Sequence, residues 1–207
     1  IAKPFVAVAG TGNDVTPCNL HLNRLLSKVR EGITSGGGAP FQFTTIAVSD
    51  AIAMGHEGMK ASLVSREIIA DSIEVMTLAE RFDALVTIAG CDKSLPGSVM
   101  ALARLNVPGV FIYGGTILPG QVDNKPVTIQ DAFEAVGKYS KGLMTAEALK
   151  ILERASCPGP GSCAGMYTAN TMSSAIEALG MALPGTSAIP AVEARRDQTS
   201  FEAGVAV

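Results

Sequence analysis

Tryptophan is absent from this chain of 207 residues, and aromatic side chains make up only 5% of it. Charged residues are also sparse at 17%, no run of lysine or arginine occurs, and the net charge is −3. The chain therefore lacks the basic surface that a nucleic-acid partner requires. No apolar stretch approaches the roughly 18–20 residues of a membrane span. With 47% hydrophobic residues and a mean hydropathy of +0.31, the composition excludes general disorder and predicts a well-buried α/β protein.

Cysteine is also scarce, with four residues and no signal-peptide pattern before them. This usage argues against a disulfide scaffold and favours thiols that act as ligands or nucleophiles in a reducing compartment. The chain begins at Ile1 without a methionine, and residues 201–207 form an apolar helical pattern with no capping glycine after it. We therefore expect residues 1–207 to be one α/β domain of a longer protein, trimmed at both ends.

Short apolar runs alternate with helical patterns along the chain. The runs that predict strands are residues 5–9, 43–48, 84–89 and 109–113. Near-continuous apolar strands that alternate with helices are typical of parallel sheets. The sequence therefore predicts an α/β fold in which helices cover both faces of a parallel sheet.

Helix start and stop signals divide the segments between these strands. Thr16 as N-cap, with Pro17 at the first helical position, predicts a helix that ends at the glycines 36–38. The other predicted helices are residues 63–79, a helix that follows a capping box at 128–131, residues 146–154 behind the N-cap Thr145, and residues 163–183. Residues 114–127 form the longest irregular stretch.

Reactive side chains follow the predicted strands, at the edge where ligands bind in open α/β sheets. These residues are Cys18 after the first strand, Ser49 and Asp50 after the second, and Cys91, Asp92 and Lys93 after the third. A glycine-proline loop precedes Cys163, which we expect at a helix N-terminus, where backbone N–H groups and the helix dipole favour a thiolate. Three cysteines are therefore expected to converge at one edge of the sheet.

Three well-separated thiolates suit an iron–sulfur cluster in which one iron lacks a protein ligand and can act as a Lewis acid on a substrate oxygen. A lone cysteine is more often a small buried hydrophobic residue, so the argument depends on the convergence of all three. Zinc is disfavoured because the chain has no CxxC pair and its two histidines lack ligand spacing. We interpret Cys157, six residues before Cys163, as structural.

Asp50 and Asp92 supply the hard oxygen ligands that Mg²⁺ prefers. Either carboxylate alone could be a helix N-cap or a loop residue, but their joint position favours a metal site. Lys93 directly follows this pair and is interpreted as functional rather than as a surface cation. His21 is interpreted as structural, and His56 without a partner is a weak catalytic signal.

The segments that carry these residues resemble the dihydroxy-acid dehydratase family, which is related to 6-phosphogluconate and sugar-acid dehydratases. The matching motifs are Thr16-Pro-Cys-Asn-Leu-His-Leu22, Val48-Ser-Asp-Ala-Ile-Ala-Met-Gly55, Leu63-Val-Ser-Arg-Glu-Ile-Ile-Ala-Asp-Ser72, Gly90-Cys-Asp-Lys-Ser-Leu-Pro-Gly97, Tyr113-Gly-Gly-Thr-Ile-Leu-Pro-Gly120 and Cys157-Pro-Gly-Pro-Gly-Ser-Cys-Ala-Gly-Met-Tyr-Thr-Ala-Asn-Thr-Met172. They span nearly the whole chain. The segment from Val48 to Gly55 resembles the branched-chain amino-acid enzyme more than the sugar-acid dehydratases.

The resemblance implies a hydro-lyase that converts 2,3-dihydroxy-3-methylbutanoate and 2,3-dihydroxy-3-methylpentanoate to the 2-oxo acids that precede valine, isoleucine and leucine. The residues that would hold the iron–sulfur cluster are Cys18, Cys91 and Cys163. Those that would bind Mg²⁺ are Asp50, Asp92 and Lys93, the lysine as a carbamate because a plain ammonium cannot ligate a cation. The substrate carboxylate and C2 hydroxyl would lie on Mg²⁺, and the C3 hydroxyl on the open iron.

In the family the base is a serine and a further Mg²⁺ ligand is a glutamate, both on a C-terminal part with a β-rich domain that is absent here. The resemblance therefore implies an N-terminal, cluster-binding domain, with no catalytic base in residues 1–207 and no activity for this chain alone. Cys18 resembles members described as carrying [2Fe–2S], which is favoured, whereas a site-differentiated [4Fe–4S] cluster also fits three cysteines.

The resemblance also implies a small dihydroxy-acid substrate and a homodimer, with neither nucleic acid nor a membrane as partner. A bacterial cytoplasm, or a plastid or mitochondrion in a eukaryote, fits reduced thiols. Three other functions remain open. The first is an aldonic-acid dehydratase with the same chemistry, the second a non-catalytic iron–sulfur redox protein, and the third a metal-free structural domain of a larger assembly.

Overall fold

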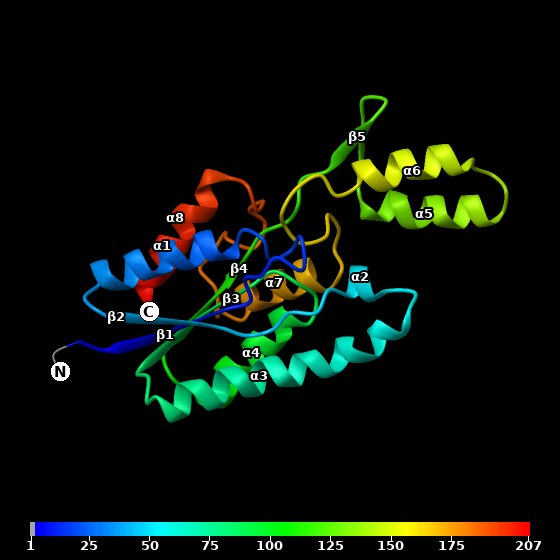
Figure 1. Ribbon diagram of the computed structural model, residues 1–207. Coiled ribbons are helices and arrows are strands. Elements are labelled where there is room, and N and C mark those ends of the chain that lie inside the picture. Colours follow the sequence, from blue (N-terminus) through cyan, green and yellow to red (C-terminus); the bar gives the residue numbers. More distant parts are fainter. Residues whose placement is uncertain (1–2) are drawn as a thin grey trace.

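Four parallel strands form the central sheet of the protein, whose computed structural model describes residues 3–207. The strands are β1 (Phe5–Gly10), β2 (Ala39–Thr44), β3 (Ala84–Ala89) and β4 (Gly109–Tyr113). Their order in the sheet is β2-β1-β3-β4, and each neighbouring pair is parallel (Figure 1). The predicted α/β class and its parallel sheet are confirmed.

Helices cover both faces of this sheet, as predicted. One face carries α1 (Leu22–Ser35) and α8 (Ala194–Ala206), and the other carries α3 (Ser62–Ala79), α4 (Ser94–Leu105) and α7 (Thr168–Ala178). Alternate residues of each strand point to opposite faces, so Val6 and Val8 of β1 pack against α1 while Ala7 and Ala9 join the core beneath α3 and α4. The sheet thus lies between two apolar layers.

The second strand lies earlier in the chain than predicted. The prediction placed it at residues 43–48, but β2 is Ala39–Thr44, and the Thr45 N–H donates to the carbonyl of Gly10 at 2.9 Å. β2 is an edge strand, and Phe41 in its middle is 44% exposed. The prediction was wrong because an edge strand does not need the continuous apolar run that marks a buried strand.

The first helix begins later than predicted. α1 begins at Leu22 rather than at Pro17. Thr16 does not cap a helix, because its hydroxyl accepts a hydrogen bond from the side-chain amide of Asn19 at 2.7 Å. Backbone hydrogen bonds from Asn19 to Thr16 and from Leu22 to Asn19 fold the segment into successive turns. Cys18 therefore lies in a turn before α1 and not on the helix.

The predicted helix at residues 163–183 is shorter at both ends, because α7 is Thr168–Ala178. At its start, the Asn170 side chain donates to the backbone carbonyl of Cys163 at 2.7 Å and holds the preceding residues as an irregular loop. At its end, Gly180 has a φ of +75°, a left-handed conformation that ends helices. Cys163 is therefore not at a helix N-terminus, contrary to the prediction.

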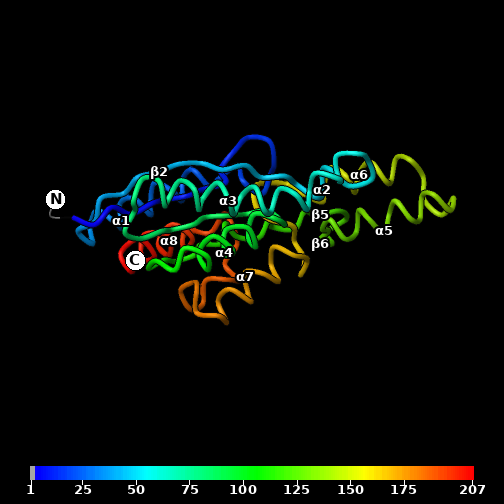
Figure 2. Tube along the Cα trace, turned by 90° about the horizontal axis from the view of Figure 1, so that it is seen from below, coloured from blue at the N-terminus to red at the C-terminus, as the bar shows by residue number. Residues whose placement is uncertain are grey.

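The remaining elements extend the body at the carboxyl end of the sheet. They are α2 (Asp50–Ala53), the 3₁₀ helix η1 (Glu57–Ala61), the antiparallel hairpin β5 (Gly120–Val122) and β6 (Lys125–Val127), α5 (Ile129–Ser140) and α6 (Ala146–Ala155). The predicted caps are confirmed, since Asp131 accepts the Thr128 backbone N–H at 2.7 Å and Thr145 accepts that of Ala148 at 3.2 Å. The α5–α6 hairpin projects from one end of the body in both views (Figure 1, Figure 2). No helix within residues 3–207 is long and apolar enough to cross a membrane.

Candidate functional site

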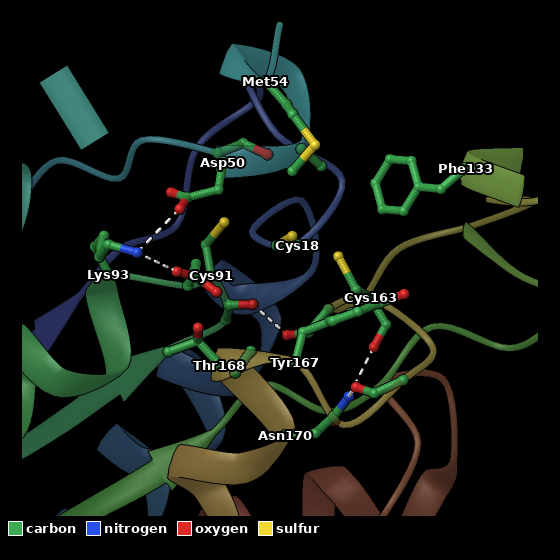
Figure 3. Close-up of a pocket in the computed structure, with 17 residues that line it drawn as sticks. Cys18, Asp50, Met54, Cys91, Lys93, Phe133, Cys163, Tyr167, Thr168 and Asn170 are labelled. Atoms are coloured by element: carbon green, nitrogen blue, oxygen red, sulfur yellow. Dashed lines mark hydrogen bonds and ion pairs between the residues drawn. The ribbon is translucent and has the colours of Figure 1, made fainter. Parts of the chain in front are cut away.

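A pocket of about 280 Å³ opens at the carboxyl ends of the strands (Figure 3). All six residues predicted to bind metal line it, which are Cys18, Asp50, Cys91, Asp92, Lys93 and Cys163. Ser49, which the sequence also placed at this edge, is part of the wall. The predicted convergence is thus present in the structure: Asp50 begins α2 and Lys93 precedes α4, whereas Cys18 and Cys163 lie in turns and loops rather than at helix N-termini.

The three cysteine-bearing segments are tied together through the residues that precede each cysteine. The Gly161 N–H donates to the carbonyl of Pro17 at 2.9 Å, and the Ser162 hydroxyl donates to the carbonyl of Gly90. At Gly90 a Cβ atom would collide with the carbonyl oxygen of Cys18, so only glycine allows the segments of Cys18 and Cys91 to approach this closely. The thiols are therefore brought together by backbone contacts.

Glycine is also required in the loop before the third cysteine. Gly161 has a φ of +131°, and a Cβ atom there would lie 2.5 Å from the backbone nitrogen of Ile117. This conformation directs Ser162 into parallel pairing beside Thr116, where the Ile117 N–H donates to the carbonyl of Ser162 at 2.8 Å. The glycine-proline loop thus places Cys163 at the pocket by joining the end of β4.

The three thiols are buried to different degrees and differ in pKa. Cys18 and Cys91 are each 4% exposed, and Cys163 is half-buried. A hydrogen bond to Cys91, together with burial, raises the pKa of Cys18, while the hydrogen bond from Cys18 lowers the pKa of Cys91. Burial and the nearby Cys91 raise the pKa of Cys163 to about 11. Metal binding must therefore displace protons from Cys18 and Cys163.

The charged side of the pocket contains an ion-paired triad. The Lys93 ammonium donates to Asp50 at 2.9 Å and also to Asp92, and the three side chains are only 15–19% exposed. Burial acts to raise the pKa of Asp50, but hydrogen bonds from Ser62 and Lys93 outweigh it and lower that pKa. Burial acts to lower the pKa of Lys93, but the hydrogen bonds to Asp92 and Asp50 outweigh it and raise that pKa.

The three thiols do not form a site for a single metal ion. Across residues 3–207, no three His, Cys, Asp or Glu side chains are grouped closely enough to hold one metal ion. Thiolates are the soft ligands that iron–sulfur clusters take, and a cluster of several irons binds cysteines farther apart than one ion does. The thiol set fits a cluster on that ground, and the two carboxylates fit a hard cation once Lys93 no longer occupies them.

The other residues that the sequence singled out lie outside the pocket. Cys157 is exposed, and its sulfur does not line the wall. His21 pairs with the carbonyl of Gly114 at 2.6 Å, and burial lowers its pKa. The His56 ring accepts the Gly58 backbone N–H at 3.0 Å and caps the 3₁₀ helix. Both histidines thus have local structural partners.

Several wall residues were not predicted from the sequence. Met54, Phe133 and Tyr167 provide apolar surface beside the thiols, and Ser162 and Asn170 provide hydrogen bonds (Figure 3). Ser162 and Asn170 stood within the matching motifs, but nothing in their residue type indicated which backbone atoms they would meet. Phe133 comes from the projecting helix α5, whose place at the pocket no pattern in the sequence indicated.

The family model and the individual relatives that match this chain point to the same family. The family model described as dihydroxy-acid/6-phosphogluconate dehydratase, N-terminal, matches residues 3–207. Proteins named dihydroxy-acid dehydratase are 58% identical in Mycobacterium tuberculosis, 56% in Nocardioides sp. and 55% in Sulfurisphaera tokodaii, each over 100% of this chain. The chain spans only 36–37% of the length of these relatives. The chain belongs to the dihydroxy-acid/6-phosphogluconate dehydratase family, of which it matches the N-terminal part.

Proposed function

We propose that this chain is the metal-holding part of a hydro-lyase that removes water from 2,3-dihydroxy-3-methylbutanoate and 2,3-dihydroxy-3-methylpentanoate to form 2-oxo acids. These products would serve the biosynthesis of valine, isoleucine and leucine. The observation that carries the proposal is one pocket that joins three thiols to two carboxylates and a lysine. The relatives named dihydroxy-acid dehydratase support the same reaction.

The pocket divides naturally between two metals. Cys18, Cys91 and Cys163 would hold an iron–sulfur cluster, a cofactor that the family uses, and [2Fe–2S] is the favoured type. Asp50 and Asp92 would bind Mg²⁺. When bound, the cluster would supply a Lewis-acidic iron for the C3 hydroxyl, and Mg²⁺ would supply positive charge for the carboxylate and C2 hydroxyl that acidifies the C2 proton.

Lys93 requires a chemical change before it can join the Mg²⁺ ligands. As an ammonium it neutralises Asp50 and Asp92 and has no lone pair to offer. To become an oxygen ligand the ammonium must first lose a proton to solvent, after which the neutral amine adds CO₂ and releases a second proton. The resulting carbamate places a negative charge, in place of a positive one, beside two carboxylates. We propose that the carbamate forms with the divalent cation in place, because its two positive charges then offset most of the charge of the three negative groups.

The apolar wall of the pocket suits a substrate with alkyl groups. Met54 and Phe133 lie beside the thiols in Figure 3, and they are 50% and 41% exposed. A methyl or ethyl group on C3 can cover this surface and exclude water from it. A sugar acid would place hydroxyl groups against the same wall without hydrogen-bond partners. The wall therefore favours the branched substrates.

The proton at C2 needs a base that we do not assign to residues 1–207. We propose that a serine base and a further glutamate ligand come from the rest of the longer protein, whose relatives extend well beyond this chain. We also propose that the longer protein is a homodimer. Residues 1–207 expressed alone should therefore form no 2-oxo acid, even after reconstitution.

The test is 2-oxo acid formation by the full-length protein, reconstituted without oxygen from iron, sulfide and Mg²⁺. Samples receive 2,3-dihydroxy-3-methylbutanoate, xylonate or gluconate in parallel. Turnover of the branched substrate alone is the expected result. Turnover of a sugar acid instead would support the proposed dehydration but contradict the proposed branched substrates. A protein that holds its cluster but turns over neither substrate would favour a redox role.

A further inference from the structure

Asn170 uses every hydrogen-bonding position of its side-chain amide. Its oxygen accepts from the hydroxyls of Tyr113 and Thr116, each at 2.6 Å. Its nitrogen donates to the backbone carbonyls of Cys163, at 2.7 Å, and Gly165. Asn170 is 8% exposed, the bond from Tyr113 is buried and the other three are partly buried, so water has limited access to them. One amide therefore connects the end of β4 to the loop that carries the third thiol.

The loop that Asn170 holds has little other support. Residues 163–167 form no helix or strand. The hydrogen bonds that hold the preceding residues to the protein body end at Ser162, whose hydroxyl donates to the carbonyl of Gly90. Within the loop, the Gly165 N–H donates back to the Cys163 carbonyl at 2.9 Å. The Thr171 hydroxyl also reaches Met166, but this contact is exposed. The buried amide of Asn170 is therefore the main link from the loop to the protein body.

The partners of Asn170 on the β4 side are themselves fixed. Tyr113 is 2% exposed, and burial raises its pKa to about 12, so its hydroxyl stays protonated and donates. The guanidinium of Arg196 lies 5.6 Å from the centre of its ring, and Arg196 is fully buried. Thr116 pairs with Ser162 and Pro190 through its backbone. The side-chain oxygen of Asn170 thus accepts hydrogen bonds from two hydroxyls, of Tyr113 and Thr116, whose own positions are fixed by their surroundings.

We propose that Asn170 is a positioning residue that fixes the Cys163 loop, and with it the third thiol, relative to Cys18 and Cys91. The inference rests on the proposed function, since the thiol it positions is taken to bind the cluster. Asn170 itself does not touch substrate or metal in this account. It acts only through the two loop carbonyls.

The main variant is Asn170→Asp in the full-length protein. The carboxylate keeps the oxygen that accepts from Tyr113 and Thr116, but it replaces the donating NH₂ by an oxygen that faces two carbonyls. Thr116→Val removes one donor to Asn170 and leaves the amide free to hold the loop. Ser174→Ala is the matched control, because its hydroxyl bonds to the backbone carbonyl of Asn170 and not to the loop.

The first readout is amide hydrogen exchange in the metal-free full-length protein, resolved by peptide. Asn170→Asp should speed exchange at residues 163–167 by about tenfold or more, because the two partly buried hydrogen bonds to the loop carbonyls are lost. Thr116→Val should give a smaller change in the same loop, and Ser174→Ala should leave the loop as in wild type. Exchange in Asn170→Asp that matches wild type, or that rises equally along the whole of α7, would overturn the positioning role.

The second readout is the cluster in the reconstituted full-length protein. Visible circular dichroism and the reduction potential should shift in Asn170→Asp and stay unchanged in Ser174→Ala. An unaltered spectrum and potential in Asn170→Asp would contradict the proposal. If wild-type protein takes up no iron, the proposed function fails, and the exchange experiment still decides whether Asn170 positions the loop. If Asn170→Asp does not fold, the smaller rise in exchange at residues 163–167 expected of Thr116→Val decides the proposal, and wild-type exchange in that loop would overturn it.

Discussion

The two sides of the pocket differ in charge, in burial and in how they are held. The thiol side, Cys18, Cys91 and Cys163, is joined by backbone contacts at glycines and at Ser162. The charged side, Asp50, Asp92 and Lys93, is joined by hydrogen bonds between side chains. The thiol side offers soft ligands and the charged side hard ones. On the proposed function, one pocket would therefore sort two metals by the chemistry of its ligands.

Without metal, the polar groups on the two sides of the pocket also have different internal partners. Cys18 and Cys91 share a hydrogen bond that raises the pKa of Cys18 and lowers the pKa of Cys91. Asp50 and Asp92 are neutralised by the internal cation Lys93. Loading the thiol side must release protons, whereas loading the charged side must displace or modify one lysine. The predictions below test this division from the largest expected effect to the smallest.

Replacing a thiol should have the largest effect. Cys91→Ser in the reconstituted full-length protein should lose most of its iron and acid-labile sulfide, because a serine hydroxyl is a poor ligand for these irons. Cys157→Ser is the matched control, since Cys157 is exposed and outside the pocket. Iron and sulfide analysis checks both variants. Equal cluster content in the two variants would remove Cys91 from the thiol side.

Gly90→Ala should break the backbone contact on which the thiol side depends. The new Cβ collides with the carbonyl oxygen of Cys18, which cannot rotate away, so we expect destabilisation of about 3 kcal/mol. Gly137→Ala is the control, because no atom lies within 4 Å of its added Cβ in helix α5, and it should stabilise by about 0.5–1 kcal/mol. Urea unfolding of the full-length protein measures both. A neutral Gly90→Ala would show that the thiol segments are not in close contact.

Lys93→Met should disturb only the charged side. In the metal-free full-length protein it should cost about 1–3 kcal/mol, because two partly buried carboxylates lose their cation. Lys60→Met is the control, and it should cost less than about 0.5 kcal/mol, since its ion pair with Glu57 is exposed. Cysteine alkylation rates should stay as in wild type. A faster reaction of Cys91 would show that the two sides are not independent.

The cost of Lys93→Met should depend on pH in a defined way. The pKa of Asp50 is lowered, so its stabilising effect is present above the ordinary value of 3.8 and is lost as pH falls through the lower folded value. The pKa of Lys93 is raised, so its effect is present below 10.5 and is lost as pH rises through the higher folded value. The difference in urea midpoint between wild type and variant should therefore be largest between these limits. A constant difference down to strongly acidic pH would contradict the ion pair.

Ser62→Ala should have the smallest effect. Compared with Ser65→Ala, it should separate the orientation of the Asp50 carboxylate from the free energy of unfolding. The Ser62 hydroxyl donates to Asp50 at 2.6 Å, and Ser65 on the same helix donates to the carbonyl of Ser62, also at 2.6 Å. Each alanine variant should cost about 1 kcal/mol, because each loses one buried hydrogen bond. Only Ser62→Ala should weaken Mg²⁺ binding, measured by calorimetry on the full-length protein. Equal Mg²⁺ affinity in both variants would remove Ser62 from the site.

Much of the fold could be predicted because its signals are local. The buried strands β1, β3 and β4 read as apolar runs, and the glycines after α1 and the capping box before α5 fix helix ends. The errors occur where side chains override these signals. Thr16 bonds to Asn19 instead of capping α1, and Asn170 keeps Cys163 out of α7. A sequence pattern does not show which distant atom a polar side chain will meet.

The composition of the pocket could be predicted because the carboxyl ends of parallel strands meet at one edge. That rule brought Cys18, Asp50 and Cys91 together without any knowledge of side-chain contacts. It could not show that Lys93 would pair with both carboxylates, since that depends on the path of residues 45–49. Nor could it place Phe133, because the α5–α6 hairpin contacts the β5–β6 hairpin rather than the central sheet, and no sequence pattern indicated that contact.

Metal analysis before and after chelation tests the division of the pocket most directly. Full-length protein is reconstituted without oxygen, and iron, sulfide and magnesium are measured before and after treatment with EDTA. We predict that EDTA removes magnesium and abolishes 2-oxo acid formation while iron and sulfide remain, and that added Mg²⁺ restores turnover. Loss of iron together with magnesium, or turnover that persists without magnesium, would contradict the assignment of the two sides to two metals.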